Sequence, residues 1–72
     1  MPDLELLVPV AILRDVPEHG LVRGQVGTIV EVLAPGVFEV EFSDDSGMSY
    51  ASFAFNAADL LRLHHSPVPE AA

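Results

Sequence analysis

The chain of 72 residues contains no cysteine and no lysine. Without thiols it can form neither disulfides nor thiolate metal sites, so its stability must come from packing, aided where needed by a partner subunit. It also lacks any apolar run near the roughly 20 residues that span a bilayer. Its first residues include acids rather than the basic residues of a signal peptide. We therefore expect a cytoplasmic protein that does not enter the membrane.

Positive charge is scarce. Three arginines stand against eleven acidic residues, which gives a formal net charge of -8. Because Lys and Arg supply most of the affinity for nucleic acid and for anionic membrane surfaces, both are disfavoured as partners. Half of the residues are hydrophobic, so we expect a folded chain, and its length fits one domain.

The most informative stretch runs from Arg23 to Phe42, where two runs rich in Val, Ile and Phe flank Ala34-Pro35-Gly36. Pro and Gly together mark a turn, so the stretch predicts a β-hairpin. In the second run, apolar residues alternate with period 2, which is typical of a half-buried strand. The side chains predicted to face the core are those of Phe38, Val40 and Phe42.

The register of this hairpin follows from a predicted three-residue loop. Since a one-residue slip would turn every side chain to the wrong face, we predict these pairs: Leu33 with Val37, Glu31 with Glu39, Ile29 with Glu41, and Thr28, Val30 and Val32 with Phe42, Val40 and Phe38. The outer face then carries Glu31, Glu39 and Glu41. It is either a solvated acidic surface or a docking surface for a basic partner.

The remaining segments predict an all-β domain. A strand is expected at 10–13 with Pro9 at its start, followed by a long loop at 14–24 under which Val16, Leu21 and Val22 can pack. After the hairpin, we expect a strand at 48–55, one helical turn at 56–60 with Asn56 as its N-cap, and a short strand at 61–63. The fourth strand buries either Met48 and Tyr50 or Ala51 and Phe53. This order predicts a small five-stranded SH3-like barrel over residues 1–63, with one helical turn before the last strand and a flexible C-terminal tail at 64–72.

The residues from Asp15 to Val32, from Gly36 to Phe42, and the pair Tyr50-Ala51 carry a resemblance to a known family. Over Leu6 to about Leu63, the chain resembles domain-of-unknown-function family 4926, a bacterial family of small proteins. The resemblance implies an SH3-like fold and this size, but no reaction. Members that lie beside toxin or effector genes would imply an immunity or antitoxin role.

Two fainter resemblances imply other functions. The strand entry at Gly24 and Gly27 is similar to the KOW motif of RNA-binding barrels, although the net charge of -8 disfavours that function here. The pattern from Gly27 to Leu60 is similar to SH3-like accessory subunits, such as the extrinsic stromal subunit of photosystem I and the variable chain of ferredoxin–thioredoxin reductase. Those likenesses are analogies of fold.

Residues suited to catalysis or metal binding are few. Adjacent His64 and His65 would point to opposite faces of an extended chain, so we predict no metal site there. Ser43–Gly47 is predicted to be a plain acidic turn, and no serine has a positioned base. We expect no enzymatic activity, no catalytic residue and no cofactor.

By elimination, the sequence favours a protein-interaction module that binds a partner protein through its acidic face, in an immunity-like or antitoxin-like role. An accessory subunit of a redox enzyme and a KOW-like barrel are the alternatives. The neighbouring gene is the first candidate source of the partner, and a homo-oligomer is left open. The predicted partner-binding residues are Glu18, His19, Leu21, Arg23, Glu31, Glu39, Glu41 and Tyr50.

Overall fold

The structure, a computed structural model, describes residues 4–64 as an all-β domain. Its elements in chain order are β1 (Pro9–Ile12), the 3₁₀ turn η1 (Pro17–His19), β2 (Val26–Ala34), β3 (Val37–Ser43), β4 (Ser49–Asn56), the 3₁₀ turn η2 (Ala57–Asp59) and β5 (Leu60–Arg62). The prediction of an all-β class with five strands and one helical turn before the last strand is confirmed. Within the described residues, no helix is long and apolar enough to cross a membrane.

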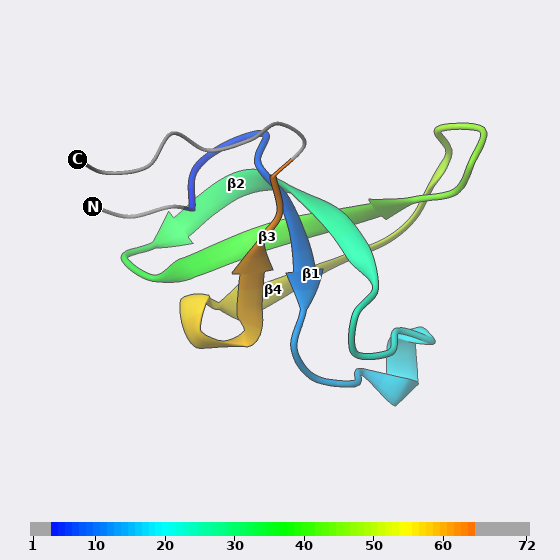
Figure 1. Ribbon diagram of the computed structural model, residues 1–72, viewed down its shortest axis with the longest axis horizontal. Helices are drawn as coiled ribbons and strands as arrows, with labels where there is room; N and C mark the ends of the chain where they lie inside the picture. Colours follow the sequence, from blue (N-terminus) through cyan, green and yellow to red (C-terminus); the bar gives the residue numbers. More distant parts are fainter. Residues whose placement is uncertain (1–3, 65–72) are drawn as a thin grey trace.

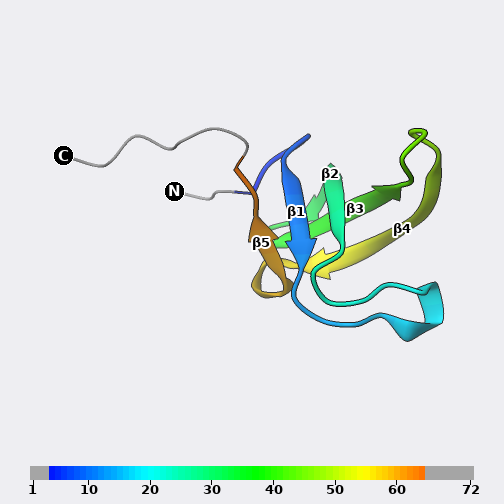
Figure 2. The same ribbon diagram turned by 45° about the vertical axis from the view of Figure 1, so that its right-hand side comes forward.

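The five strands form one antiparallel sheet in the order β4-β3-β2-β1-β5. Residues 26–28 of β2 pair with β1, and residues 28–34 of β2 pair with β3. Figure 1 shows β1 and the orange strand β5 running across β3 and β4. Figure 2 shows β5 beside β1, with which it pairs. The sheet therefore curls on itself.

The core lies inside this curled sheet. Phe38, Val40 and Phe42 are 5, 0 and 0% exposed, as their alternation predicts. They pack with buried residues from every other strand, namely Val10, Ile12, Ile29, Phe55 and Leu60. No polar or charged residue of the described chain is buried, so apolar packing stabilises the fold.

The predicted register of the hairpin is correct at its middle and wrong at both ends. Glu31 pairs with Glu39 and Val32 with Phe38, as expected, but Ala34 rather than Leu33 pairs with Val37. The loop thus has two residues, and Pro35 followed by Gly36 at φ +75° fits a type II turn. A β-bulge accommodates the extra residue, Leu33, because a bulge sets two residues against one on the partner strand.

A second bulge, at Val30, changes which side of β2 faces the core. Ile29 pairs with Val40 rather than with Glu41, and it is fully buried. Val30 and Val32, both predicted to face inward, are 39% and 49% exposed. The prediction for this part of β2 is wrong because it assumed an uninterrupted ladder.

The facing of β4, which the sequence left open, is decided by a third irregularity. Phe42 pairs with Ala51 and Ser43 with Ser49, so Tyr50 is the extra residue. Ala51 and Phe53 are half-buried, whereas Met48 and Tyr50 are 67% and 49% exposed. The second of the two predicted arrangements is therefore correct.

The element ends differ from the predictions by about one residue. β1 begins at Pro9 and ends at Ile12, and β5 begins at Leu60. Asn56 occupies the N-cap position of η2, but its side chain makes no capping hydrogen bond. Of the predicted C-terminal tail, only His64 lies within the described residues.

Candidate functional site

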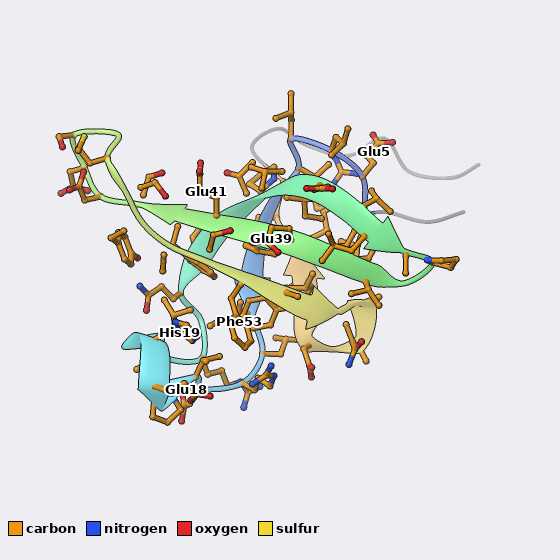
Figure 3. All side chains as sticks on the ribbon, turned by 180° about the vertical axis from the view of Figure 1, so that it is seen from behind. Glu5, Glu18, His19, Glu39, Glu41 and Phe53 are labelled. Atoms are coloured by element: carbon orange, nitrogen blue, oxygen red, sulfur yellow. The ribbon has the colours of Figure 1, made fainter. Side chains whose placement is uncertain are left out.

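The acidic face consists of Glu31 on β2 and Glu39 and Glu41 on β3. Glu31 and Glu39 are directly opposed, as predicted, and Glu41 pairs with Ser52 on β4 rather than with Ile29. Glu31 is exposed, and the other two are half-buried along the pleat. Figure 3 shows Glu39 and Glu41 on the same side of β3. The carboxylates thus gather on the outer side of the strands whose inner side builds the core.

The charge of the acidic face is not neutralised by the described part of the chain. Among residues 4–64, the one ion pair joins Arg14 Nε to Asp59 Oδ2 at 3.3 Å, away from the acidic face. Glu39 accepts a hydrogen bond from the Ser52 hydroxyl, which leaves its charge in place. Like charges directly opposed across a ladder are destabilising by a fraction of roughly 1 kcal/mol. A cationic group supplied from outside would remove that repulsion.

The long loop supplies the other predicted group of contact residues. Its turn η1 ends at Gly20, whose φ of +69° suits glycine. Backbone hydrogen bonds between Val16 and Leu21 close the turn, and both side chains are fully buried. Leu21 is therefore a core residue, and its prediction as a contact residue is wrong because its side chain is needed to seal the domain beneath the loop. Val22, expected to tuck inward, is 60% exposed.

Contacts at both ends of the loop and at its tip hold it in place. Asp15 Oδ1 accepts a hydrogen bond of 2.7 Å from the backbone amide of Arg23. At the tip, the ring of His19 lies 4.6 Å from that of Phe53 (Figure 3). Beside it, the guanidinium carbon of Arg14 lies 5.1 Å from the ring centroid of Phe55, within the range of cation–π attraction. These contacts tie the loop to the inner face of β4.

The predicted contact residues therefore form two groups instead of one surface. Figure 3 shows Glu18 and His19 on the loop, across β4 from Glu39 and Glu41. Glu18 and Arg23 are exposed. Tyr50 is also exposed, and its hydroxyl accepts a hydrogen bond from the side-chain amide of Gln25, which connects β4 to the entry of β2.

The acidic turn after β3 is a structural feature. Asp44 Oδ1 accepts hydrogen bonds from Ser46 Oγ at 2.7 Å, from Ser46 N at 2.9 Å and from Met48 N at 3.0 Å. The Ser46 side chain, followed by the Met48 amide, holds the pKa of Asp44 below its ordinary value of 3.8. Because this carboxylate oxygen is occupied by the turn, the prediction of a plain acidic turn agrees with the geometry.

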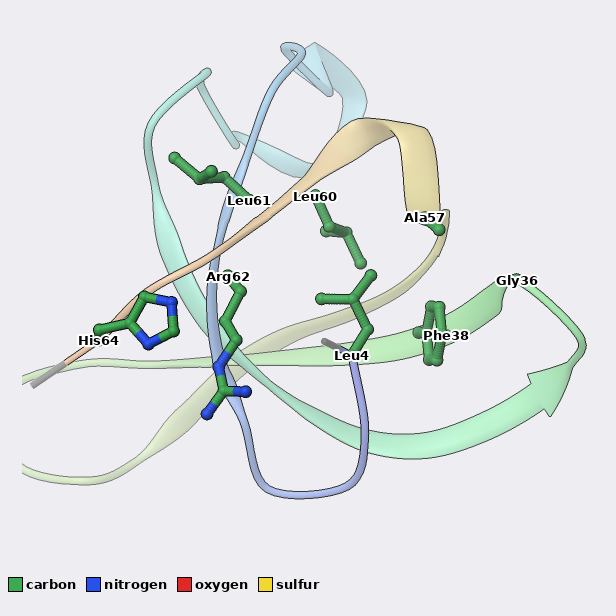
Figure 4. Close-up of a pocket in the computed structure, with 8 residues that line it drawn as sticks. All are labelled: Leu4, Gly36, Phe38, Ala57, Leu60, Leu61, Arg62 and His64. Carbon is green, nitrogen blue, oxygen red and sulfur yellow. The ribbon is translucent and has the colours of Figure 1, made fainter. Parts of the chain in front are cut away.

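A pocket of about 510 Å³ was missed by the sequence reasoning. It opens between β5, the turn of the β2–β3 hairpin and the start of the described chain (Figure 4). Apolar side chains line most of it, and Arg62 and His64 contribute the guanidinium and the imidazole. Residues two apart on an extended chain point to the same side, so the spacing of Arg62 and His64 could have predicted that both side chains face one site.

The prediction that His64 and His65 form no metal site is only partly addressed by the structure, because His65 lies outside the described residues. Within residues 4–64, no three His, Asp or Glu side chains come close enough together to hold a metal ion.

The geometry defines a small all-β domain with an acidic outer face and a tethered loop. The family model described as Domain of unknown function (DUF4926) matches residues 6–62, and the chain belongs to this family. That assignment agrees with the resemblance carried by Asp15–Val32 and the second hairpin strand. No curated protein and no solved structure matches the chain significantly.

Proposed function

We propose that the protein is a non-enzymatic interaction module that binds a basic partner protein through Glu31, Glu39 and Glu41. One observation carries the proposal. Three carboxylates gather on two adjacent strands, two of them directly opposed, and no cation from the described residues pairs with them. A partner bearing Lys or Arg would form charge-assisted hydrogen bonds there and relieve the repulsion.

The same face disfavours the nucleic-acid alternative. Phosphates would meet carboxylates rather than cations on the outer side of β3, and the whole chain carries a formal charge of -8. Electrostatic attraction to phosphate supplies most non-specific nucleic-acid affinity. We therefore propose protein recognition as the function and the bacterial cytoplasm as its setting, with an immunity-like or antitoxin-like role as one form and an accessory subunit of a redox enzyme as another.

The test begins with a tagged copy of the protein purified under native conditions from its own host. A retained protein is identified and purified, with the product of the neighbouring gene tested first, and its affinity is measured by calorimetry. We expect the double variant Glu39→Lys/Glu41→Lys to bind at least tenfold more weakly while keeping the wild-type melting temperature within a few degrees.

The matched control is Glu18→Lys/Asp45→Lys. It changes the formal charge by the same amount but places both lysines outside the acidic face, on the loop and in the turn after β3. We expect it to retain most of the binding. Equal weakening by both variants would mean that net charge, or the predicted contact residue Glu18, contributes to binding as much as this face does. An unweakened Glu39→Lys/Glu41→Lys complex would refute the proposal.

A further inference from the structure

Strand β4 lies at one end of the sheet order and pairs with β3 alone. Its eight residues, Ser49–Asn56, include no charged residue and no proline. Natural edge strands are usually protected by charges, by proline or by a covering element, because an open edge presents unpaired backbone groups. The composition of β4 therefore provides neither charges nor proline to protect this edge.

The hydrogen-bond pattern shows which groups of β4 face outward. The amide of Ala57 donates to the carbonyl of Gly36 at 2.8 Å, just beyond the end of the β3–β4 ladder. In an antiparallel ladder, residues that bond to the partner strand alternate with residues whose backbone faces away. Counting back through the observed register from this bond assigns the outward-facing backbone to Ser52, Ala54 and Asn56.

These outward groups are available. Among residues 4–64, no backbone hydrogen bond outside the β3–β4 ladder involves Ser52, Ala54 or Asn56. All three residues are exposed. The loop touches β4 through Phe53 and Phe55, and Gln25 touches it through Tyr50; none of these contacts involves the three outward-facing residues. The edge can therefore accept main-chain hydrogen bonds from another extended segment.

The side chains beside this edge specify its charge preference. Ser52 is paired with Glu41, and Ala54 with Glu39, so two small side chains separate the edge from two carboxylates. An added strand would lie about 5 Å from β4 and roughly 10 Å from β3. A Lys or Arg side chain on its outer face can extend across Ser52 or Ala54 to the carboxylates.

We propose that an extended basic segment of the partner protein adds to β4 as a further strand, with Lys or Arg at alternate positions directed toward Glu39 and Glu41. This inference rests on the proposed function and specifies its mode of binding. Main-chain hydrogen bonds would supply affinity, and the alternating cations would supply specificity. A second copy of this chain is a poorer occupant, because each copy carries a formal charge of -8.

The first test uses a synthetic peptide, acetyl-Thr-Lys-Thr-Lys-Thr-Lys-Thr-amide, and ¹⁵N-labelled protein. Binding is expected to slow amide hydrogen exchange at least tenfold at Ser52, Ala54 and Asn56, whose amides face outward. Phe53 and Phe55, already bonded to β3, should change little. Two further peptides are N-methylated on alternate residues, one on the lysines and one on the threonines. One of them should fail to bind and the other should bind unchanged, because only alternate amides of an added strand face β4.

Two variants separate this inference from the proposed function. Ala54→Pro removes one outward amide without removing a β3–β4 hydrogen bond, since proline is tolerated on an edge where its nitrogen faces solvent. It should abolish peptide binding, as should Glu39→Lys/Glu41→Lys. If Ala54→Pro does not fold, the N-methylated peptides make the same test on the wild-type protein.

Each outcome decides between the two ideas. Peptide binding that survives both N-methylation patterns, or no peptide binding at all, would overturn strand addition. The proposed function would nevertheless stand if the identified partner still loses affinity for Glu39→Lys/Glu41→Lys, and it would fail if that affinity is unchanged. Protection of the β4 amides that rises with protein concentration and accompanies dimer formation would replace the basic strand with a second copy and overturn the inference.

Discussion

Replacing Gly27 with alanine is expected to lower the free energy of unfolding by about 1–2 kcal/mol. Gly27 is buried in β2 opposite Val10. A Cβ at this position would lie 2.6 Å from Val40 Cγ1, 2.8 Å from the carbonyl oxygen of Glu41 and 2.9 Å from Phe42 Cδ1. The second of these atoms belongs to the backbone of β3, so it cannot move without disturbing the hairpin.

Two effects of opposite sign set this magnitude. Adding a methyl group to a packed core costs roughly 1–3 kcal/mol. Removing a glycine restricts the unfolded chain, which contributes about 0.4–1 kcal/mol toward stability. The steric term is larger because three atoms lie within 3.0 Å of the new methyl group. For a domain of this size, the net loss corresponds to a decrease of roughly 4–16 °C in the melting temperature.

Gly24 provides the matched control, because its φ is +94° and a Cβ there would meet nothing within 4 Å. At Gly24, where only the backbone conformation matters, asparagine should be tolerated better than alanine. At Gly27, where space matters, alanine should be tolerated better than the larger asparagine. Urea unfolding of the four variants, compared at equal m-values, measures both orders. A melting temperature of Gly27→Ala equal to or above that of the wild type would refute the close approach of β2 and β3.

Three further predictions concern charged residues. Asp44→Ala should lower the melting temperature at pH 7, and the difference from wild type should shrink as the pH falls through the depressed pKa of Asp44, which lies below 3.8, because a carboxyl whose pKa is lowered on folding loses its stabilising contribution when it is protonated. A difference that does not shrink between pH 7 and acid pH would contradict this. Arg14→Lys should destabilise by about 0.5–1 kcal/mol in urea unfolding, since lysine keeps the charge but loses planar stacking on Phe55, and full stability would argue against that contact. Glu31→Lys should raise stability by a few tenths of a kcal/mol by removing the repulsion from Glu39, while calorimetry should show weaker partner binding; tighter binding would count against the acidic face.

Much of the candidate site follows from the sequence. The opposition of Glu31 and Glu39 was predicted correctly from a three-residue loop, and in the structure a two-residue loop together with the bulge at Leu33 gives the same pair. The division of the contact residues into two groups was not predictable, because it depends on His19 packing against Phe53, a residue 34 positions away in the chain. The outward-facing backbone groups of β4 were also not predictable, because the composition of a strand does not indicate which of its alternate residues bond to the neighbouring strand.

The bulges in the strands were likewise not predictable from the sequence pattern. Ile29 and Val30 are adjacent and both apolar, so a pattern of apolar and polar residues cannot choose which one faces inward. The choice is made by the packing of the closed core, where Ile29 contacts residues from strands before and after it in the chain. Tyr50 is likewise displaced by the bulge where β4 begins, and it becomes exposed even though its alternation allowed burial.

The all-β class, the hairpin, the core face of β3 and the acidic character of the opposite face could all be predicted from the amino-acid sequence. These properties depend on local periodicity, turn chemistry and charge, which act between residues close in the chain. The facing of β2 and β4, the burial of Leu21, the pocket beside Arg62 and the open edge at Ala54 became apparent from the folded chain alone. Those properties arise from contacts between distant segments, where one extra residue in a strand reverses every side chain beyond it.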